Sequence, residues 1–119
     1  MDNFLNELKS IGIDVDSTLE RFMNNEGLYK KFLLKFPNDN NIDILMEQIK
    51  NKDYSVAATT AHTLKGVTGN LGLTPLYEKV TGIVNDLRNG VYDNLEEDCE
   101  CVVNRYKEFC DVLEKFNLK

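Results

Sequence analysis

Apolar residues recur along this chain at intervals of three and four positions, the spacing of a helix face, and not at the interval of two that marks a half-buried strand. The clearest stripe lies near the C-terminus and keeps a 4-3-4-3 spacing. It consists of Val102, Tyr106, Phe109, Leu113 and Phe116. Three acidic residues, Glu96, Glu97 and Asp98, stand near the positive end of that helix's dipole. The pattern predicts an all-α protein.

The N-terminal quarter divides into short helices. Asp2 can cap a first helix that ends before Gly12. The run Ser17-Thr18-Leu19-Glu20 is a capping box and predicts the start of a second helix. The residues that would end this second helix are Asn24, Asn25 and Gly27.

A third helical face follows and is interrupted by proline. Its predicted apolar positions are Leu28, Phe32 and Phe36. Pro37 and the polar run after it break the pattern, which resumes on a shifted phase at Ile42, Leu45 and Ile49. The segment is either one long helix kinked near Pro37 or two helices in succession.

Two further helices fill the centre of the chain. Asp53 is the expected N-cap of the first, whose apolar stripe is Tyr54, Ala57, Ala61, Leu64, Thr68 and Leu71, and Gly72 ends it. Thr74 and Pro75 provide a capping hydroxyl and a proline at the first helical position of the next. The core face of that helix runs through Leu76, Val80, Ile83 and Leu87 to Gly90.

Short connections at Lys52, at Leu73 and around Tyr92 favour antiparallel neighbours. We therefore expect an antiparallel up-down-up-down four-helix bundle with a short N-terminal helical addition, as a single domain over residues 1–119.

Composition narrows the function classes. The net charge of −6 disfavours nucleic acid as a partner, because nucleic-acid binding needs clustered lysine and arginine. No stretch approaches the ~18 apolar residues of a membrane span, and the first residues do not resemble a secretory signal. Three cysteines with a single histidine fit neither a disulfide framework nor a zinc pattern. We expect a cytoplasmic protein with reduced thiols, a monomer whose partners are proteins.

The candidate chemistry lies on the helix of residues 53 to 71. On a helical wheel His62 falls roughly 140° from the centre of the apolar stripe, so it should face solvent. Gly66 and Gly69 share its face, although each glycine inside a helix costs about 1 kcal/mol relative to alanine. Lys65, three residues on, can reach the same volume. An exposed imidazole beside a cation, with no steric cover, suits a nucleophile for a phosphoryl group. A lone surface histidine without function is the ordinary alternative.

The stretch that begins at Ala61-His62 and continues through Leu64-Lys65-Gly66 to Leu71-Gly72 closely resembles the signature of histidine-containing phosphotransfer (HPt) domains. Chain length and the motif's position within a bundle agree with that family. The resemblance implies a phosphorelay, in which His62 takes a phosphoryl group from the aspartate of one receiver domain and passes it to another. The partners implied are receiver domains of response regulators or of a hybrid sensor histidine kinase.

By the same resemblance, Lys65 would stabilise the phosphoryl group, and Gly66 and Gly69 would leave room for the docking receiver. Ala58 and Thr59 are further candidate docking residues. No cofactor or metal is expected here, since Mg²⁺ belongs to the receiver. The chain contains no glycine-rich nucleotide loop, so a kinase activity of its own is not expected.

Two questions stay open at this point. The family often places a polar side chain on the following helix to orient the histidine, and here Thr81, Gly82, Val84 and Asn85 occupy that neighbourhood, so Glu78 or Asn85 could serve. Leu73 and the methyl group of Thr63 are candidate apolar docking groups. The alternative function is a helical adaptor that binds a receiver or kinase domain without carrying phosphate.

Overall fold

The computed structural model describes residues 3–116, and within that range it is all-helical, as the apolar spacing predicts. The elements are α1 (Asn3–Ser10), α2 (Val15–Arg21), α3 (Glu26–Lys35), the 3-10 turn η1 (Phe36–Asn38), α4 (Asn41–Lys50), α5 (Tyr54–Asn70), α6 (Thr74–Asn89) and α7 (Leu95–Lys115). Asp2, the expected first cap, lies outside the described residues.

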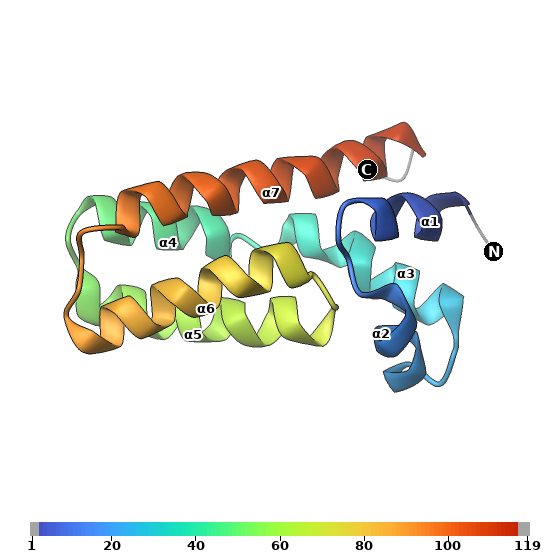
Figure 1. The fold of residues 1–119 in the computed structure, drawn as a ribbon, viewed down its shortest axis with the longest axis horizontal. Helices are drawn as coiled ribbons and strands as arrows, with labels where there is room; N and C mark the ends of the chain where they lie inside the picture. Colours follow the sequence, from blue (N-terminus) through green and yellow to red (C-terminus); the bar gives the residue numbers. More distant parts are fainter. Residues whose placement is uncertain (1–2, 117–119) are drawn as a thin grey trace.

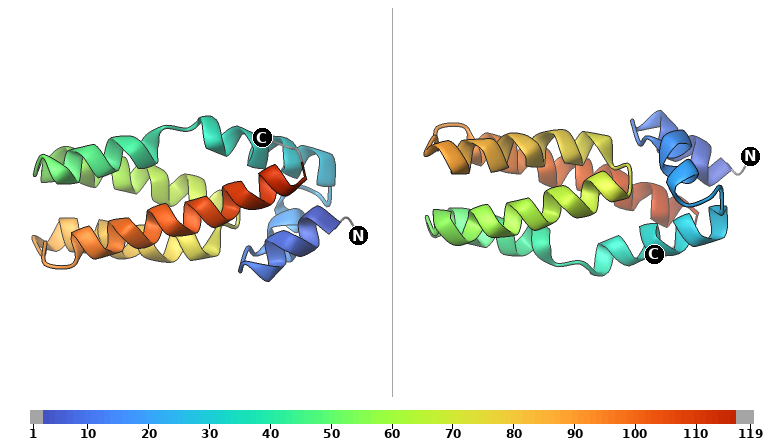
Figure 2. Two further views of the ribbon diagram at one scale, coloured as in Figure 1. Left: turned by 90° about the horizontal axis from the view of Figure 1, so that it is seen from above. Right: turned by 90° about the horizontal axis from the view of Figure 1, so that it is seen from below.

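Helices α4 to α7 run along the long axis of the molecule (Figure 1). Helix α5 packs against α4 on one side and α6 on the other, and α7 contacts both α6 and α4. The short helices α1 to α3 lie at one end, near the C-terminal ends of α5 and α7, as the views from above and below make clear (Figure 2). This end of the molecule therefore brings the N-terminal segment close to the helix that carries His62.

The segment around Pro37 forms two helices in succession, which decides between the two predicted possibilities. Helix α3 ends at Lys35, η1 contains the proline, and α4 begins at Asn41. Within α3 the buried positions are Tyr29 and Leu33, whereas Leu28 and Phe32 are each 40% exposed. The predicted face was therefore wrong by one position at Leu28 and Phe32, whereas Phe36, in η1, is buried as predicted. The observed face and the predicted face each contain an apolar pair four residues apart. Only the observed face also makes a buried hydrogen bond, which the Tyr29 hydroxyl donates to the Leu71 carbonyl over 2.8 Å.

Two predicted N-termini were also wrong. Helix α2 begins at Val15 because Asp14 is its N-cap and its carboxylate accepts from the Ser17 amide, so Ser17 lies inside the first turn. Helix α6 begins at Thr74, one residue before the expected start, and Leu73 occupies the N-cap position. The Thr74 hydroxyl donates to the Gly72 carbonyl instead of capping the helix.

Other boundaries agree with the predictions in position. Asp53 is the N-cap residue of α5, although its side chain makes no capping hydrogen bond. Gly72 and Gly90 follow α5 and α6 with φ values of +71° and +69°, in the left-handed region that glycine adopts most easily. The three acidic residues Glu96, Glu97 and Asp98 fill the first turn of α7.

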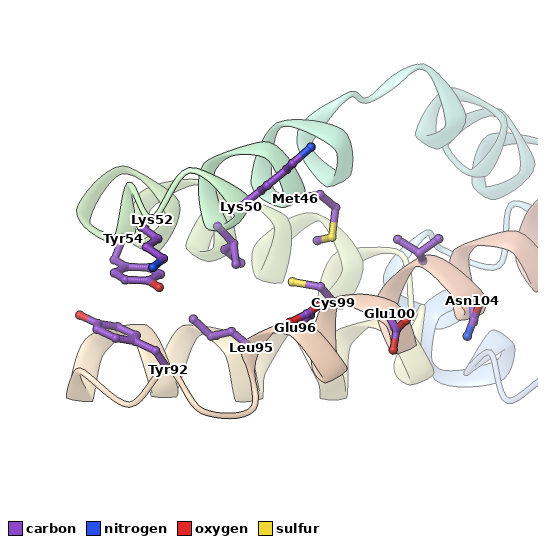
Figure 3. Close-up of a pocket in the computed structure, with 12 residues that line it drawn as sticks. Met46, Lys50, Lys52, Tyr54, Tyr92, Leu95, Glu96, Cys99, Glu100 and Asn104 are labelled. Carbon is purple, nitrogen blue, oxygen red and sulfur yellow. The ribbon is translucent and has the colours of Figure 1, made fainter.

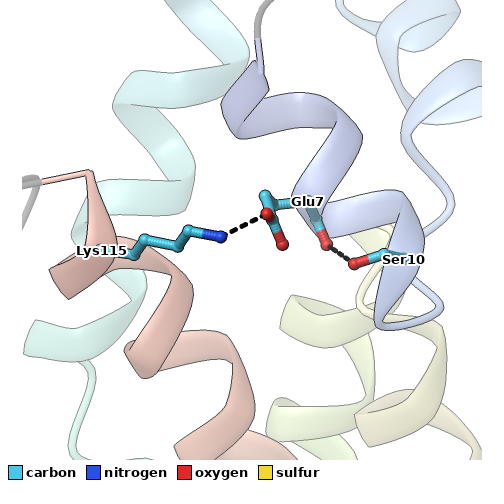
Figure 4. Close-up of polar contacts among 3 residues, drawn as sticks. All are labelled: Glu7, Ser10 and Lys115. Carbon is cyan, nitrogen blue, oxygen red and sulfur yellow. Dashed lines mark hydrogen bonds and ion pairs between the residues drawn. The ribbon is translucent and has the colours of Figure 1, made fainter.

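Helix α1 is held against the end of α7. The Lys115 ammonium pairs with the Glu7 carboxylate, and the Ser10 hydroxyl donates to the Glu7 main-chain carbonyl (Figure 4). The rings of Phe4 and Phe116 meet edge-on with their centroids 5.7 Å apart. These contacts make the N-terminal helices part of the same core as the longer ones.

No helix within residues 3–116 combines the length and the apolar character that a bilayer crossing requires. The three cysteines carry free thiols, with Cys99 and Cys110 buried and Cys101 half-buried.

Candidate functional site

Helix α5 presents His62 to solvent. Its buried positions are Ala57, Ala61, Leu64 and Thr68, which form one face against the core. The buried Thr68 hydroxyl is satisfied by the Leu64 carbonyl, 2.9 Å away. Since His62 lies off this face, its side chain is exposed, as the helical wheel predicts.

A surface hollow of about 530 Å³ lies beside His62. Its lining consists of Arg21, His62, Lys65, Gly66, Gly69, Asn70 and Tyr77. Four of these residues were predicted as site residues and are brought together here. Ala58 and Thr59, the other two, do not line the hollow: Ala58 is half-buried against the core, and Thr59 is exposed. Leu73 is fully buried, so the expectation that it is an exposed docking residue was wrong.

The two glycines of the hollow differ in what their missing side chains allow. A Cβ added at Gly66 would meet nothing within 4 Å, so this glycine leaves open space next to His62. A Cβ added at Gly69 would lie 3.0 and 3.1 Å from two ring carbons of Tyr77 on α6. Gly66 therefore keeps the surface bare, whereas Gly69 lets the tyrosine ring pack closely against α5.

The charges around the hollow are of one sign. Lys65 and Arg21 contribute two cations, and no aspartate or glutamate is among the lining residues, although the chain has a net charge of −6. Within the described residues neither cation pairs with a carboxylate, because the ion pairs found there join Lys9 to Asp16, Lys79 to Asp98 and Lys115 to Glu7. An unneutralised pair of cations around an imidazole favours an anion.

The His62 ring makes no hydrogen bond to any residue in the described part of the chain. Glu78 and Asn85, the two residues expected to orient the ring, are both exposed and give it no such contact. The Thr81 hydroxyl on α6 is buried and has no hydrogen-bond partner between residues 3 and 116. Neither nitrogen of the imidazole is therefore occupied by a hydrogen bond to the described part of the chain.

Arg21 is the site residue that sequence reasoning missed. Its Nη2 donates to the carbonyls of Gly69 and Asn70, at 3.0 and 3.3 Å, and lies 3.4 Å from the Thr18 hydroxyl oxygen. These carbonyls belong to the last turn of α5, where a helix leaves acceptors unsatisfied. Nothing in the local sequence links residue 21 to residues 69 and 70, since only the packing of α2 on the end of α5 brings them together.

A larger hollow of about 640 Å³ lies between α4 and the first half of α7 (Figure 3). Tyr54 and Tyr92 stack at its edge with ring centroids 3.8 Å apart. Cys99 lines it, but burial, together with the nearby carboxylates of Asp98 and Glu96, raises the pKa of this thiol to about 11. The thiol stays protonated at neutral pH and is a poor nucleophile.

The candidate metal ligands of residues 3–116 are not clustered. No group of three or more His, Cys, Asp or Glu side chains in residues 3–116 is placed to hold a metal ion. The chemistry available in the hollow is that of a nucleophilic imidazole and two cations.

Comparison with protein-family models, with curated proteins and with solved structures found no match to this chain.

Proposed function

We propose that the chain is a histidine phosphotransfer module of a two-component phosphorelay. His62 accepts a phosphoryl group from a receiver-domain aspartate and passes it to the aspartate of another receiver domain. In this proposal α4 to α7 form an antiparallel up-down-up-down four-helix bundle, α1 to α3 are the N-terminal addition, and the protein acts as a cytoplasmic monomer.

The observation that carries the proposal is the set of side chains that line the hollow beside His62. It combines one exposed imidazole with two cations and no carboxylate, on a bare strip of backbone at Gly66. An imidazole with a free nitrogen is a nucleophile, and the neighbouring Lys65 favours the dianionic group that it would carry. The resemblance of this stretch to the HPt signature supports the same conclusion.

The proposed step exchanges one bond to phosphorus for another. The lone pair of an unprotonated His62 nitrogen attacks the phosphorus of an aspartyl phosphate, so an N–P bond forms while the acyl O–P bond breaks. The aspartate leaves as a carboxylate, and the electron pair of the broken bond goes with it. Lys65 offsets charge on the phosphoryl oxygens as the group moves. The reverse step loads the next receiver.

The test is intact-mass analysis at neutral to alkaline pH after mixing the protein with a receiver domain charged by a small-molecule phosphodonor and Mg²⁺. We expect one added phosphoryl group that is lost in acid. It should be absent from a His62→Gln variant and from a sample without receiver. Receiver binding without any transfer, unchanged by His62→Gln, would contradict the proposal and support the adaptor function.

A further inference from the structure

Arg21 has hydrogen-bonding capacity that the fold does not use. An arginine side chain carries five N–H donors, and only the Nη2 group of Arg21 is engaged, by the Gly69 and Asn70 carbonyls and the Thr18 hydroxyl. Within residues 3–116 the donors on Nη1 and Nε have no acceptor. The guanidinium is therefore fixed at one edge and free at the other, beside the hollow that it helps to line.

Arg21 belongs to α2, and the point at which it contacts α5 determines what it can bind. Arg21 is held at Gly69 and Asn70, and Gly69 lies seven residues after His62, which is about 10 Å along the helix axis. Side chains on a helix lean toward its N-terminus, so the His62 ring leans away from Arg21. Lys65 follows His62 by three residues and lines the same hollow, whereas Arg21 contacts α5 about one turn beyond Lys65.

A second hollow, with apolar and charged lining residues, continues the surface beyond Arg21. This hollow, of about 480 Å³, lies between α2, α3 and the end of α5, and it shares Arg21 and Asn70 with the His62 hollow. Phe22, Phe32 and Val67 contribute apolar side chains to it, and Lys35 and Asp39 add one charge of each sign. The rings of Phe22 and Phe32 pack with centroids 5.6 Å apart, yet Phe32 remains 40% exposed.

We propose that the receiver domain docks on a continuous strip that runs from His62 across Arg21 to Phe32, which we call the docking strip. The receiver presents a carboxylate to the free edge of Arg21 and an apolar side chain to the hollow at Phe22 and Phe32. This docking strip rests on the proposed function, on the continuity of the two hollows, and on the charge of an arginine that forms no ion pair with a carboxylate in residues 3–116. The N-terminal helices α2 and α3 then belong to the partner-recognition surface.

The test compares two phosphodonors on the same set of proteins. One donor is a phosphorylated receiver domain, which can cover the docking strip. The other is phosphoramidate, a small molecule that transfers its phosphoryl group to an imidazole with release of ammonia and is too short to contact both His62 and Arg21. The rate of phosphorylation at His62 is measured with each donor, as a function of receiver concentration for the first.

The variants have matched controls within the chain. Arg21→Gln is paired with Arg105→Gln, because Arg105 also donates to a main-chain carbonyl, that of Pro75, and does not line the His62 hollow. Phe32→Ser is paired with Tyr92→Ser, because Tyr92 is 42% exposed and packs on another aromatic ring in the hollow of Figure 3. Arg21→Lys keeps a cation that can still donate to the α5 carbonyls, so it covers the case in which the glutamine variant does not fold.

We expect Arg21→Gln to lower kcat/KM with the receiver about tenfold, the effect of losing one charge-assisted hydrogen bond, through a higher KM. Phe32→Ser should lower kcat/KM with the receiver several-fold. The value for Arg21→Lys should lie between those of the unsubstituted chain and Arg21→Gln. Phosphorylation by phosphoramidate should stay within twofold for every variant, and the two controls should match the unsubstituted chain with both donors.

Two results would overturn the docking strip while leaving the proposed function intact. One is an equal loss with both donors, which would mean that Arg21 acts on the phosphoryl group itself. The other is a kcat/KM with the receiver that is unchanged in Arg21→Gln and Phe32→Ser, or that falls equally in their paired controls. Failure of both donors to phosphorylate His62 in the unsubstituted chain would refute the proposed function instead.

Discussion

Replacing Gly72 with alanine tests how tightly the end of α5 is joined to α2. An added Cβ would contact the Thr18 hydroxyl and lie 2.7 Å from the Asp14 main-chain oxygen, and Thr18 is completely buried and cannot swing aside. The φ value of +71° adds the cost of a left-handed alanine, about 1–2 kcal/mol. Overpacking adds about 1–3 kcal/mol, so we expect a total loss of about 2–5 kcal/mol in the free energy of unfolding.

Gly90→Ala is the matched control. Gly90 has nearly the same φ, +69°, but an added Cβ would meet nothing within 4 Å, so only the backbone cost of about 1–2 kcal/mol applies. Urea denaturation of both variants, followed by circular dichroism, measures the difference. Equal losses in the two variants would refute the reasoning, because they would show that α2 does not press against this turn.

Three further predictions follow from single contacts. Gly66→Ala should raise the free energy of unfolding by about 0.5–1 kcal/mol, because the site is open, while slowing transfer from a receiver; denaturation and intact mass measure the two effects. Tyr29→Phe should lower the free energy of unfolding by about 1 kcal/mol, because the hydrogen bond to the Leu71 carbonyl is lost; denaturation measures this change. Burial raises the pKa of Cys99 from 9.0 to about 11, which favours the neutral thiol in the fold, so its contribution to stability is complete below pH 9 and is lost between pH 9 and about 11. The alkaline loss of stability over that range should be smaller in Cys99→Ala.

Much of the fold follows from the sequence because helix faces repeat. The stripes of α5, α6 and α7 each keep a consistent spacing over several turns, and most of the predicted positions are buried. In α7, however, Tyr106 and Phe116 are only half-buried. The short N-terminal helices were harder. In α3 two overlapping stripes satisfy the same spacing, and only the contact of Tyr29 with Leu71 selects one of them. In α2 an aspartate three residues before the predicted cap takes its role.

The residues of the candidate site also divide into those that the sequence predicts and those that depend on how helices pack. His62, Lys65, Gly66 and Gly69 lie within eight residues of one helix, so helix geometry alone predicts their common face. Arg21 is 48 residues before Gly69, and its place in the hollow depends on how two helices pack. Sequence periodicity has no information on such a contact. The distinct role of Gly69 beneath Tyr77 is hidden for the same reason, since it depends on the pairing of α5 with α6.

The central claim is that His62 carries a phosphoryl group, and phosphorus NMR of the protein after incubation with a charged receiver tests it most directly. The account predicts a single phosphohistidine resonance that disappears in acid, survives in alkali and is missing from the His62→Gln variant. An acid-stable resonance, or an acid-labile one that persists in His62→Gln, would contradict it.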